Sequence, residues 1–182
     1  MTYYPDTCVE GDVAHFCDDC EATENGRVRS VWFQRSTYTF SDPTSQAEWQ
    51  TAVANGDVVV VANTHGVFDG GTPNYGQGFG DVEQKYLNST FKLNFFDPNV
   101  KNNYEFYEGK KRSTTWFIGY RTSSLVWVGD TPVTVAPKVA VPDDLKEGLA
   151  WEVEATWTSA NHPEPFTMPE DIFSCFLVSC FG

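Results

Sequence analysis

The stretch Trp151-Glu152-Val153-Glu154-Ala155-Thr156-Trp157 decides the fold, because its polarity alternates residue by residue. Apolar side chains stand at every second position, and glutamate or threonine fills the positions between them. Successive side chains of a β-strand point to opposite faces, so this period of two predicts a strand with one buried and one wet face. A second layer of structure is therefore expected on its apolar side.

The segments just before this strand extend the same pattern. Residues 114–121 and 125–128 are two β-rich runs separated by three polar residues, which predicts a hairpin. Residues 133–141 form another extended segment. Pro132 and Pro137 place that segment at a sheet edge, because proline cannot donate a ladder hydrogen bond.

Three further strands are expected towards the N-terminal side. Residues 28–40 form a long apolar strand, broken near 34–36, and residues 85–96 alternate apolar with polar side chains. The valine-rich segment 57–62 is bounded by turn residues, which predicts a short, fully buried strand.

Two short helices and one long loop complete the expected fold. Asp42-Pro43-Thr44 offers a cap and a proline for a helix that ends at Asn55-Gly56, and a second helix is expected from Val100 to Tyr107, closed by Gly109. Six glycines and a proline between His65 and Asp81 predict a loop without regular structure. The sequence thus predicts an all-β, mainly antiparallel fold: a β-sandwich or partial barrel with one or two short flanking helices.

Charge and hydrophobicity divide the chain into three parts. Residues 1–26 hold seven Asp or Glu and no Lys or Arg, which is typical of a solvated, acidic N-terminal arm. Residues 27–160 hold the predicted strands and form the β-sandwich domain. Residues 161–182 begin proline-rich and end apolar, so we expect an extended C-terminal tail that docks on its own domain or on a neighbour.

Composition excludes several classes of function. The 182 residues include 25 acidic and 12 basic side chains, and the resulting net charge of −13 disfavours direct binding to nucleic acid or to anionic lipid. No apolar run reaches the length of a membrane span, and the start lacks the pattern of a signal peptide, so synthesis in a cytosol is expected. An acidic wall can still line a conduit through which DNA passes without adhering.

All five cysteines lie near the two ends of the chain. Cys17 and Cys20 form a C-x-x-C pair, and with Cys175 and Cys180 they could provide four zinc ligands that join the termini. A disulfide would require oxidation after release from the cell. Because Cys175 and Cys180 flank four core-like residues, we prefer buried free thiols, with zinc or a disulfide as the second interpretation and no other cofactor.

His65 and Asp69 are the best candidate catalytic pair, since a histidine with a carboxylate on a loop can act as a general base. No G-x-S-x-G nucleophile motif occurs, and a histidine beside a glycine turn more often bonds to the backbone. The glycine-rich residues 76–80 lack the Lys-Ser/Thr of a phosphate loop. We therefore expect no enzymatic activity, with a hydrolase as an alternative.

Several short segments between about Ser30 and Phe173 resemble, in order and composition, structural proteins of tailed bacteriophages that infect Bacteroidetes, the crAss-like group included. These segments are Ser30-Val31-Trp32-Phe33, Phe40 with Asp42-Pro43-Thr44 and Trp49, Phe68-Asp69-Gly70-Gly71-Thr72-Pro73, Asp97-Pro98-Asn99, Asn102-Asn103-Tyr104-Glu105-Phe106-Tyr107, and 151–157. The resemblance implies a virion building block without catalytic residues. Tail-tube subunits of that kind are typically a β-sandwich or partial barrel flanked by a helix, with long loops and termini that contact neighbouring subunits.

The resemblance leads to an expected function. We expect a non-enzymatic virion protein, made in the host cytoplasm, that assembles in many copies as a tail-tube or connector subunit. Its partners would be copies of itself and other virion proteins, without sequence-specific nucleic-acid or membrane binding. Alternatives are a head decoration or auxiliary capsid protein, or a carbohydrate- or receptor-binding module with Tyr75 and Phe79 as stacking platforms. The residues expected at interfaces are Tyr75, Phe79, Phe173, Phe176, Leu177 and Phe181.

Overall fold

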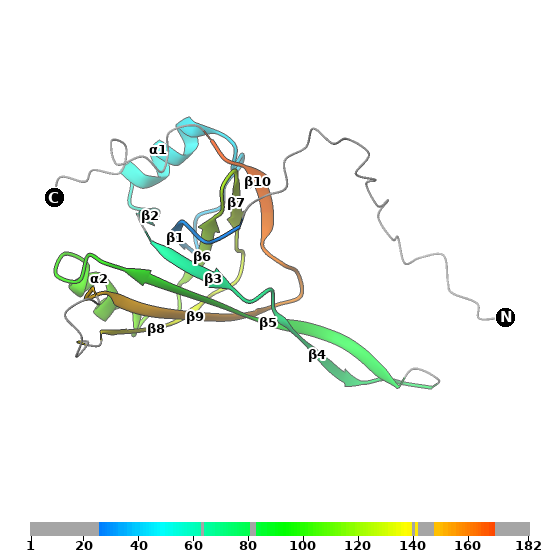
Figure 1. Ribbon diagram of the computed structural model, residues 1–182. Helices are drawn as coiled ribbons and strands as arrows, with labels where there is room; N and C mark the ends of the chain where they lie inside the picture. Colours follow the sequence, from blue (N-terminus) through cyan, green and yellow to red (C-terminus); the bar gives the residue numbers. More distant parts are fainter. Residues whose placement is uncertain (1–25, 63, 81–82, 140, 142–147, 170–182) are drawn as a thin grey trace, which may run out of the picture.

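Two antiparallel sheets pack face to face, with two short helices beside them (Figure 1). The computed structural model describes residues 26–62, 64–80, 83–139, 141 and 148–169. The first sheet has the strand order β10-β7-β6-β1-β2, with β1 (Ser30–Arg35), β2 (Val58–Val61), β6 (Trp116–Arg121), β7 (Leu125–Val128) and β10 (Glu164–Thr167). The second has the order β3-β5-β9-β8, with β3 (His65–Phe68), β5 (Gln84–Asp97), β8 (Thr134–Val139) and β9 (Trp151–Ser159), and β4 (Thr72–Gln77) also pairs with β5. The predicted all-β, sandwich-like fold with short helices is confirmed.

The main core lies between the two sheets, and β9 contributes its whole apolar face to it. Trp151, Val153, Ala155 and Trp157 are all at most 5% exposed. The glutamates of the opposite face form cross-strand ion pairs, Glu152 with Lys138 at 3.1 Å and Glu154 with Lys92 at 3.4 Å. The alternation that predicted this strand is therefore confirmed, and β8 lies at the sheet edge as its prolines predicted.

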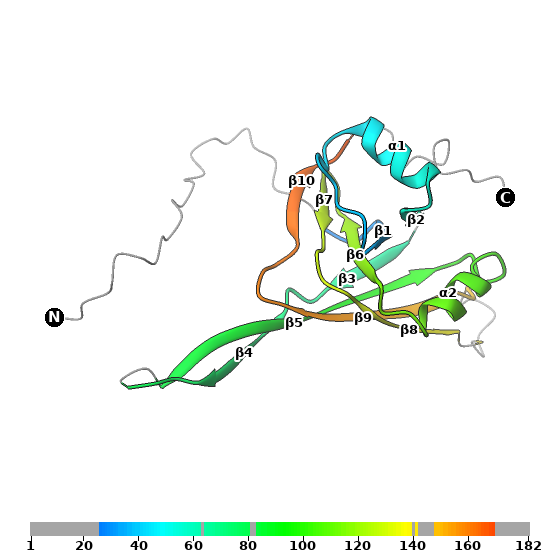
Figure 2. The same ribbon diagram turned by 180° about the vertical axis from the view of Figure 1, so that it is seen from behind.

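Strand β1 is buried on both faces, because helix α1 (Gln46–Ala54) covers the side of the first sheet that faces away from the second (Figure 2). Val31 and Phe33 face the main core, whereas Trp32 packs on the helix. The Trp32 and Trp49 rings meet edge to face with their centroids 4.9 Å apart. The molecule therefore has three layers at this point, and β1 is its centre.

Helix α1 begins three residues later than predicted. Its N-cap is Ser45, whose side chain accepts a hydrogen bond from the Glu48 backbone N–H. Asp42 instead begins the preceding turn: its carbonyl accepts from Ser45 N–H at 3.0 Å, and its own N–H donates to the Glu48 carboxylate at 2.7 Å. The predicted end is confirmed, with Asn55 as C-cap and Gly56 in the left-handed region at φ 73°.

Helix α2 (Tyr104–Lys110) is tied to the end of β5 by a buried carboxylate. Asp97 is fully buried and accepts hydrogen bonds from Asn99 N–H at 2.9 Å, Asn103 Nδ2 at 2.6 Å and the Tyr107 hydroxyl at 2.8 Å. Burial, and then the charge of Asp97, raises the pKa of Tyr107. Gly109 lies inside this helix and does not close it, which corrects that part of the prediction.

The prediction that residues 65–81 form a loop without regular structure is wrong. Residues 65–68 and 72–77 are strands β3 and β4, both hydrogen-bonded to β5. Gly66 is required by close packing within the sheet, because a Cβ there would lie 2.4 Å from the Asn94 carbonyl oxygen. Gly66 and Gly76 thus lie in extended strands, whereas Gly70, Gly71 and Gly80 have positive φ and do lie at turns.

Two smaller expectations also change. Segment 57–62 does form a strand, but β2 lies at the edge of its sheet, so Val59 and Val60 are only half-buried. In the stretch 161–169, β10 adds to the free side of β7 as the outermost strand of the first sheet. Residues beyond 169 lie outside the described part of the chain, as do residues 1–25 of the predicted N-terminal arm 1–26.

Candidate functional site

A two-stranded hairpin projects from the sandwich and is the most distinctive feature of the surface (Figures 1 and 2). It consists of β4 and the first part of β5, with partners from Thr72↔Thr90 to Gln77↔Gln84. Strand β9 pairs with β5 only from Ser89 onwards, so residues 84–88 extend past the sheet. We call residues 72–80 and 83–88 the projecting hairpin.

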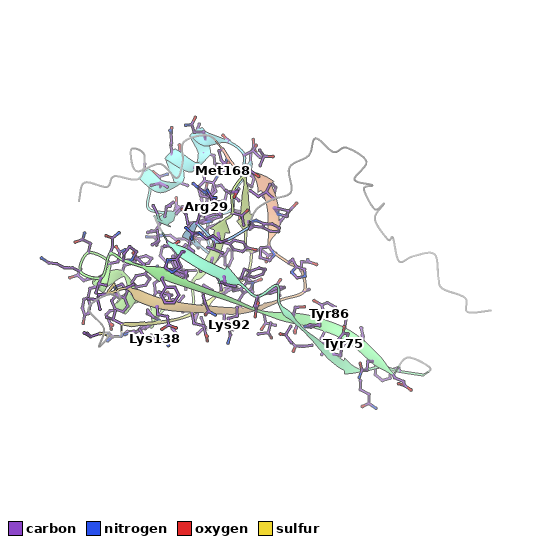
Figure 3. All side chains as sticks on the ribbon, in the orientation of Figure 1. Arg29, Tyr75, Tyr86, Lys92, Lys138 and Met168 are labelled. Atoms are coloured by element: carbon purple, nitrogen blue, oxygen red, sulfur yellow. The ribbon has the colours of Figure 1, made fainter. Side chains whose placement is uncertain are left out.

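The projecting hairpin carries exposed aromatic and aliphatic side chains (Figure 3). Phe79 at the tip is 92% exposed, Tyr75 57%, Leu87 54% and Tyr86 42%. Apolar side chains that gather on one exposed element typically mark a surface that binds a partner. Tyr75 and Phe79, which the sequence predicted as interface residues, both lie on the projecting hairpin.

Hydrogen bonds within the hairpin and at its base hold it in a defined conformation. The Asn74 side-chain amide donates to Asn88 Oδ1 at 2.8 Å and to Thr90 Oγ1 at 2.9 Å. The Tyr86 hydroxyl donates to the Ala160 carbonyl at 2.9 Å, which links the hairpin to the segment after β9. At the tip, Gly78 N–H donates to the Glu83 carbonyl. These hydrogen bonds order the hairpin internally and connect it to the sandwich.

A tight turn at residues 69–71 connects β3 to β4 and sets the direction in which the hairpin leaves the sandwich. Asp69 Oδ1 accepts hydrogen bonds from Gly71 N–H at 3.0 Å and from Lys92 N–H at 3.1 Å. Gly71 has φ +87°, and a Cβ at this position would lie 2.4 Å from the ring of Phe91, which is fully buried. Only glycine satisfies both conditions at this corner.

A pocket of about 410 Å³ opens at the base of the projecting hairpin, and we call it the root pocket. It lies where the two sheets meet, because Phe68 comes from β3 of the second sheet while Tyr120 and Trp127 come from β6 and β7 of the first. An isolated bridge between Val28 and Gly66 forms part of its wall. Its walls are mainly apolar, which is typical of a binding pocket.

Arginines occur in and next to the backbone segments that line the root pocket. Arg27 lines it, and Arg29 and Arg121 come from the backbone segments beside it, joined by a hydrogen bond from Arg29 N–H to the Arg121 carbonyl. Burial lowers the pKa of Arg121, and the nearby charge of Arg29 lowers it further. In the described part of the chain, Arg27 is the basic side chain that lines the pocket itself.

The structure does not bring His65 and Asp69 together as a catalytic pair. The His65 ring stacks on Phe96 with centroids 4.9 Å apart, and the Asp69 carboxylate is occupied by the backbone N–H groups of the corner. The two residues lie four positions apart along an extended segment, which is about 13 Å. His162 is exposed and its ring meets the edge of Phe91.

Most of the other predicted site residues cannot be placed. Cys17, Cys20, Cys175 and Cys180 lie outside the described residues, as do Phe173, Phe176, Leu177 and Phe181. Within the described ranges, no group of three or more His, Cys, Asp or Glu side chains could hold a metal ion. In the same ranges, no helix is both long and apolar enough to cross a membrane.

Sequence reasoning missed the root pocket and the buried Lys110. Lys110 is 6% exposed, and its Nζ lies 3.1 Å from the ring centre of Trp116. Burial, followed by the charge of Arg35, lowers the pKa of Lys110 to about 8.

Comparisons with protein-family models, with curated proteins and with solved structures find no match to this chain.

Proposed function

We propose that the chain is a non-enzymatic structural subunit that assembles in many copies through its projecting hairpin. The observation that carries the proposal is the exposure of Tyr75, Phe79 and Leu87 on a hairpin that extends past the sheet. Two-stranded hairpins alone are marginally stable in water, and free strand edges invite pairing with another chain. Contact with a neighbouring copy would bury these side chains.

The hydrogen bonds of the hairpin support the same role. Asn74 and Tyr86 hold the hairpin through side-chain hydrogen bonds before any partner is present. A preformed binding element loses little conformational entropy on association, so more of the contact energy contributes to affinity. The element is therefore suited to repeated assembly of identical copies.

We further propose that this assembly belongs to a bacteriophage particle, in the tail tube or connector and otherwise on the head. This step rests on the resemblance of the segments between about Ser30 and Phe173 to phage structural proteins. The net charge of −13 is compatible with a wall that DNA passes without adhering. Other virion proteins would be additional partners.

Electron microscopy and sedimentation of the purified full-length chain at increasing concentration test the proposal. We expect rings or hollow filaments. A matched variant replaces residues 74–88 by Asn-Gly, because Pro73 and Ser89 face each other in the ladder and a two-residue turn can join them. This variant should keep the tryptophan bands of its near-ultraviolet circular dichroism, because all six tryptophans lie outside the replaced segment, and it should remain monomeric. Dispersed monomers of the unaltered chain, or undiminished assembly of the variant, would contradict the proposal.

Carbohydrate binding is a second candidate, favoured by the exposed Tyr75 and Tyr86, whose rings meet edge to face at 6.1 Å on the hairpin. Aromatic rings of this kind offer apolar faces for sugar rings. A rise in melting temperature with a glycan, lost in Tyr75→Ala, would support this candidate. A glycan screen without any such shift would reject it.

A further inference from the structure

The tip of the projecting hairpin carries an exposed apolar side chain, and the walls of the root pocket are mainly apolar. Phe79 is flanked by Gly78 and Gly80, and Gly80 adopts φ +63°, so the aromatic side chain stands clear of its own turn. The root pocket offers apolar walls from Val28, Phe68 and Trp127, and its volume of about 410 Å³ lies within the range that accommodates bulky ligands.

Charge is complementary as well. Glu83 follows the tip in sequence, and its backbone carbonyl accepts a hydrogen bond from Gly78 N–H, so its backbone lies beside the residue that precedes Phe79. Arg27 lines the pocket, and among the residues that the structure describes neither Arg27 nor Arg29 takes part in an ion pair. Opposite charges across an interface fix its orientation more than its affinity.

A copy cannot fill its own pocket with its own tip. Phe68 lines the pocket and Phe79 forms the tip, and eleven residue-to-residue steps of mostly extended chain lead from one to the other. At about 3.3 Å per residue this distance is up to about 35 Å, and the corner at Gly71 points the hairpin away from the sandwich (Figure 1). Any occupant of this kind must come from another copy.

We infer that Phe79 of one copy inserts into the root pocket of a second copy, with Glu83 beside Arg27. This inference rests on the proposed function and names the surface that receives the hairpin. The contact joins two different surfaces, so it repeats from copy to copy and generates a ring or a filament. The displacement between neighbouring copies equals the distance from pocket to tip, at most about 35 Å.

Photo-crosslinking tests the contact directly. A photoreactive phenylalanine analogue at position 79 of the full chain should yield crosslinked dimers joined to peptides around Val28, Phe68, Tyr120 and Trp127. Assemblies whose crosslinks map elsewhere would overturn the pocket contact and leave the proposed function standing. If no assemblies form at any concentration, both proposals are wrong.

Charge reversal gives an independent test with a built-in rescue. At about 0.15 M salt, where the net charge is largely screened, Arg27→Glu and Glu83→Arg should each raise the concentration needed for assembly by about tenfold, since like charges then meet at the contact. An equimolar mixture of the two variants should assemble, because opposite charges face each other again at every contact of an alternating chain. Lys138→Glu, a reversal on the outer face of β8, is the control that should leave assembly unchanged. Unimpaired single variants, or a mixture without rescue, would overturn the inference.

Discussion

Lys110 is a cation held against aromatic rings without a carboxylate partner among the described residues. Its Nζ lies 3.1 Å from the ring centre of Trp116 and 4.7 Å from that of Phe106. A charged amine gains attraction from the ring faces but loses hydration when it is buried. Burial, followed by the nearby charge of Arg35, lowers the pKa of Lys110 to about 8.

The lowered pKa of Lys110 predicts a pH dependence of stability. Between about pH 8 and the usual pKa of 10.5, the unfolded chain binds more protons at this residue than the folded chain. The free energy of unfolding should therefore gain a rising contribution across this interval. Lys110→Met lacks this contribution. As pH rises from 7 to 9.5, the free energy of unfolding of the unaltered chain should therefore increase relative to that of Lys110→Met.

Urea denaturation at a series of pH values measures this difference. The buried tyrosines are present in both proteins, so their contributions cancel. Lys111→Met is the matched control, because Lys111 is more exposed and pairs with Glu108. Parallel stability curves for the unaltered chain and Lys110→Met would contradict the prediction.

The contrast between Lys110 and Lys111 shows what sequence reasoning could not reach at this scale. Both belong to a basic run at the end of a predicted helix, where cations are favoured by the helix dipole. Only the position around the helix decides that Lys110 points at Trp116 while Lys111 does not. That position depends on tertiary packing, which the run of charges does not encode.

At the scale of elements, the corner between β3 and β4 predicts a large effect of a small substitution. Gly71→Ala would place a Cβ 2.4 Å from the Phe91 ring and would also strain a φ of +87°. We expect a loss of about 2–4 kcal/mol in the free energy of unfolding, from backbone strain and overpacking together.

Gly70→Ala separates the two causes. Gly70 also has a positive φ, +75°, but a Cβ there meets nothing within 4 Å, so only the backbone strain of about 1 kcal/mol applies. Denaturant unfolding of both variants gives the comparison. Equal losses would show that the contact with Phe91 does not restrict this corner.

The same corner explains which elements could be predicted. Strands β5 and β9 follow from their alternation, because each lies over the core on one face. Strand β4 has no alternation to detect, since it runs out past the sheet, where neither face is buried. Gly66 adds to the difficulty, because a glycine needed for close contact within a sheet cannot be told from a turn glycine by sequence.

At the scale of the whole molecule, the proposed contact joins the projecting hairpin to the root pocket. Only the hairpin could be predicted from the sequence. Tyr75 and Phe79 are aromatic residues in a glycine-rich segment, so they could be predicted as interface residues from the sequence. The root pocket combines residues 26–28, 66–68, 120–127 and 162–163, which come together only when the two sheets pack. Single-sequence patterns carry no information on such long-range neighbours.

The net charge of −13 leads to a prediction for assembly that depends on salt. Two such copies about 35 Å apart repel by about 6 kcal/mol at 0.01 M salt and by only a few tenths at 0.15 M, treating each as a point charge in water. A single exposed Arg27–Glu83 pair contributes about 1 kcal/mol or less. Repulsion is the larger effect, so added salt should promote assembly although it weakens that ion pair.

Sedimentation at fixed protein concentration, with sodium chloride raised from about 0.01 M to 0.3 M, measures this balance over the range in which the Debye length falls from about 30 Å to below 8 Å. We expect the assembled fraction to rise steeply up to about 0.15 M and then level off. A neutral osmolyte at equal osmolality is the control and should have little effect, because it leaves the charges unscreened. Assembly that declines steadily with salt would mean that contacts between opposite charges, and not apolar contacts of the hairpin, hold the copies together.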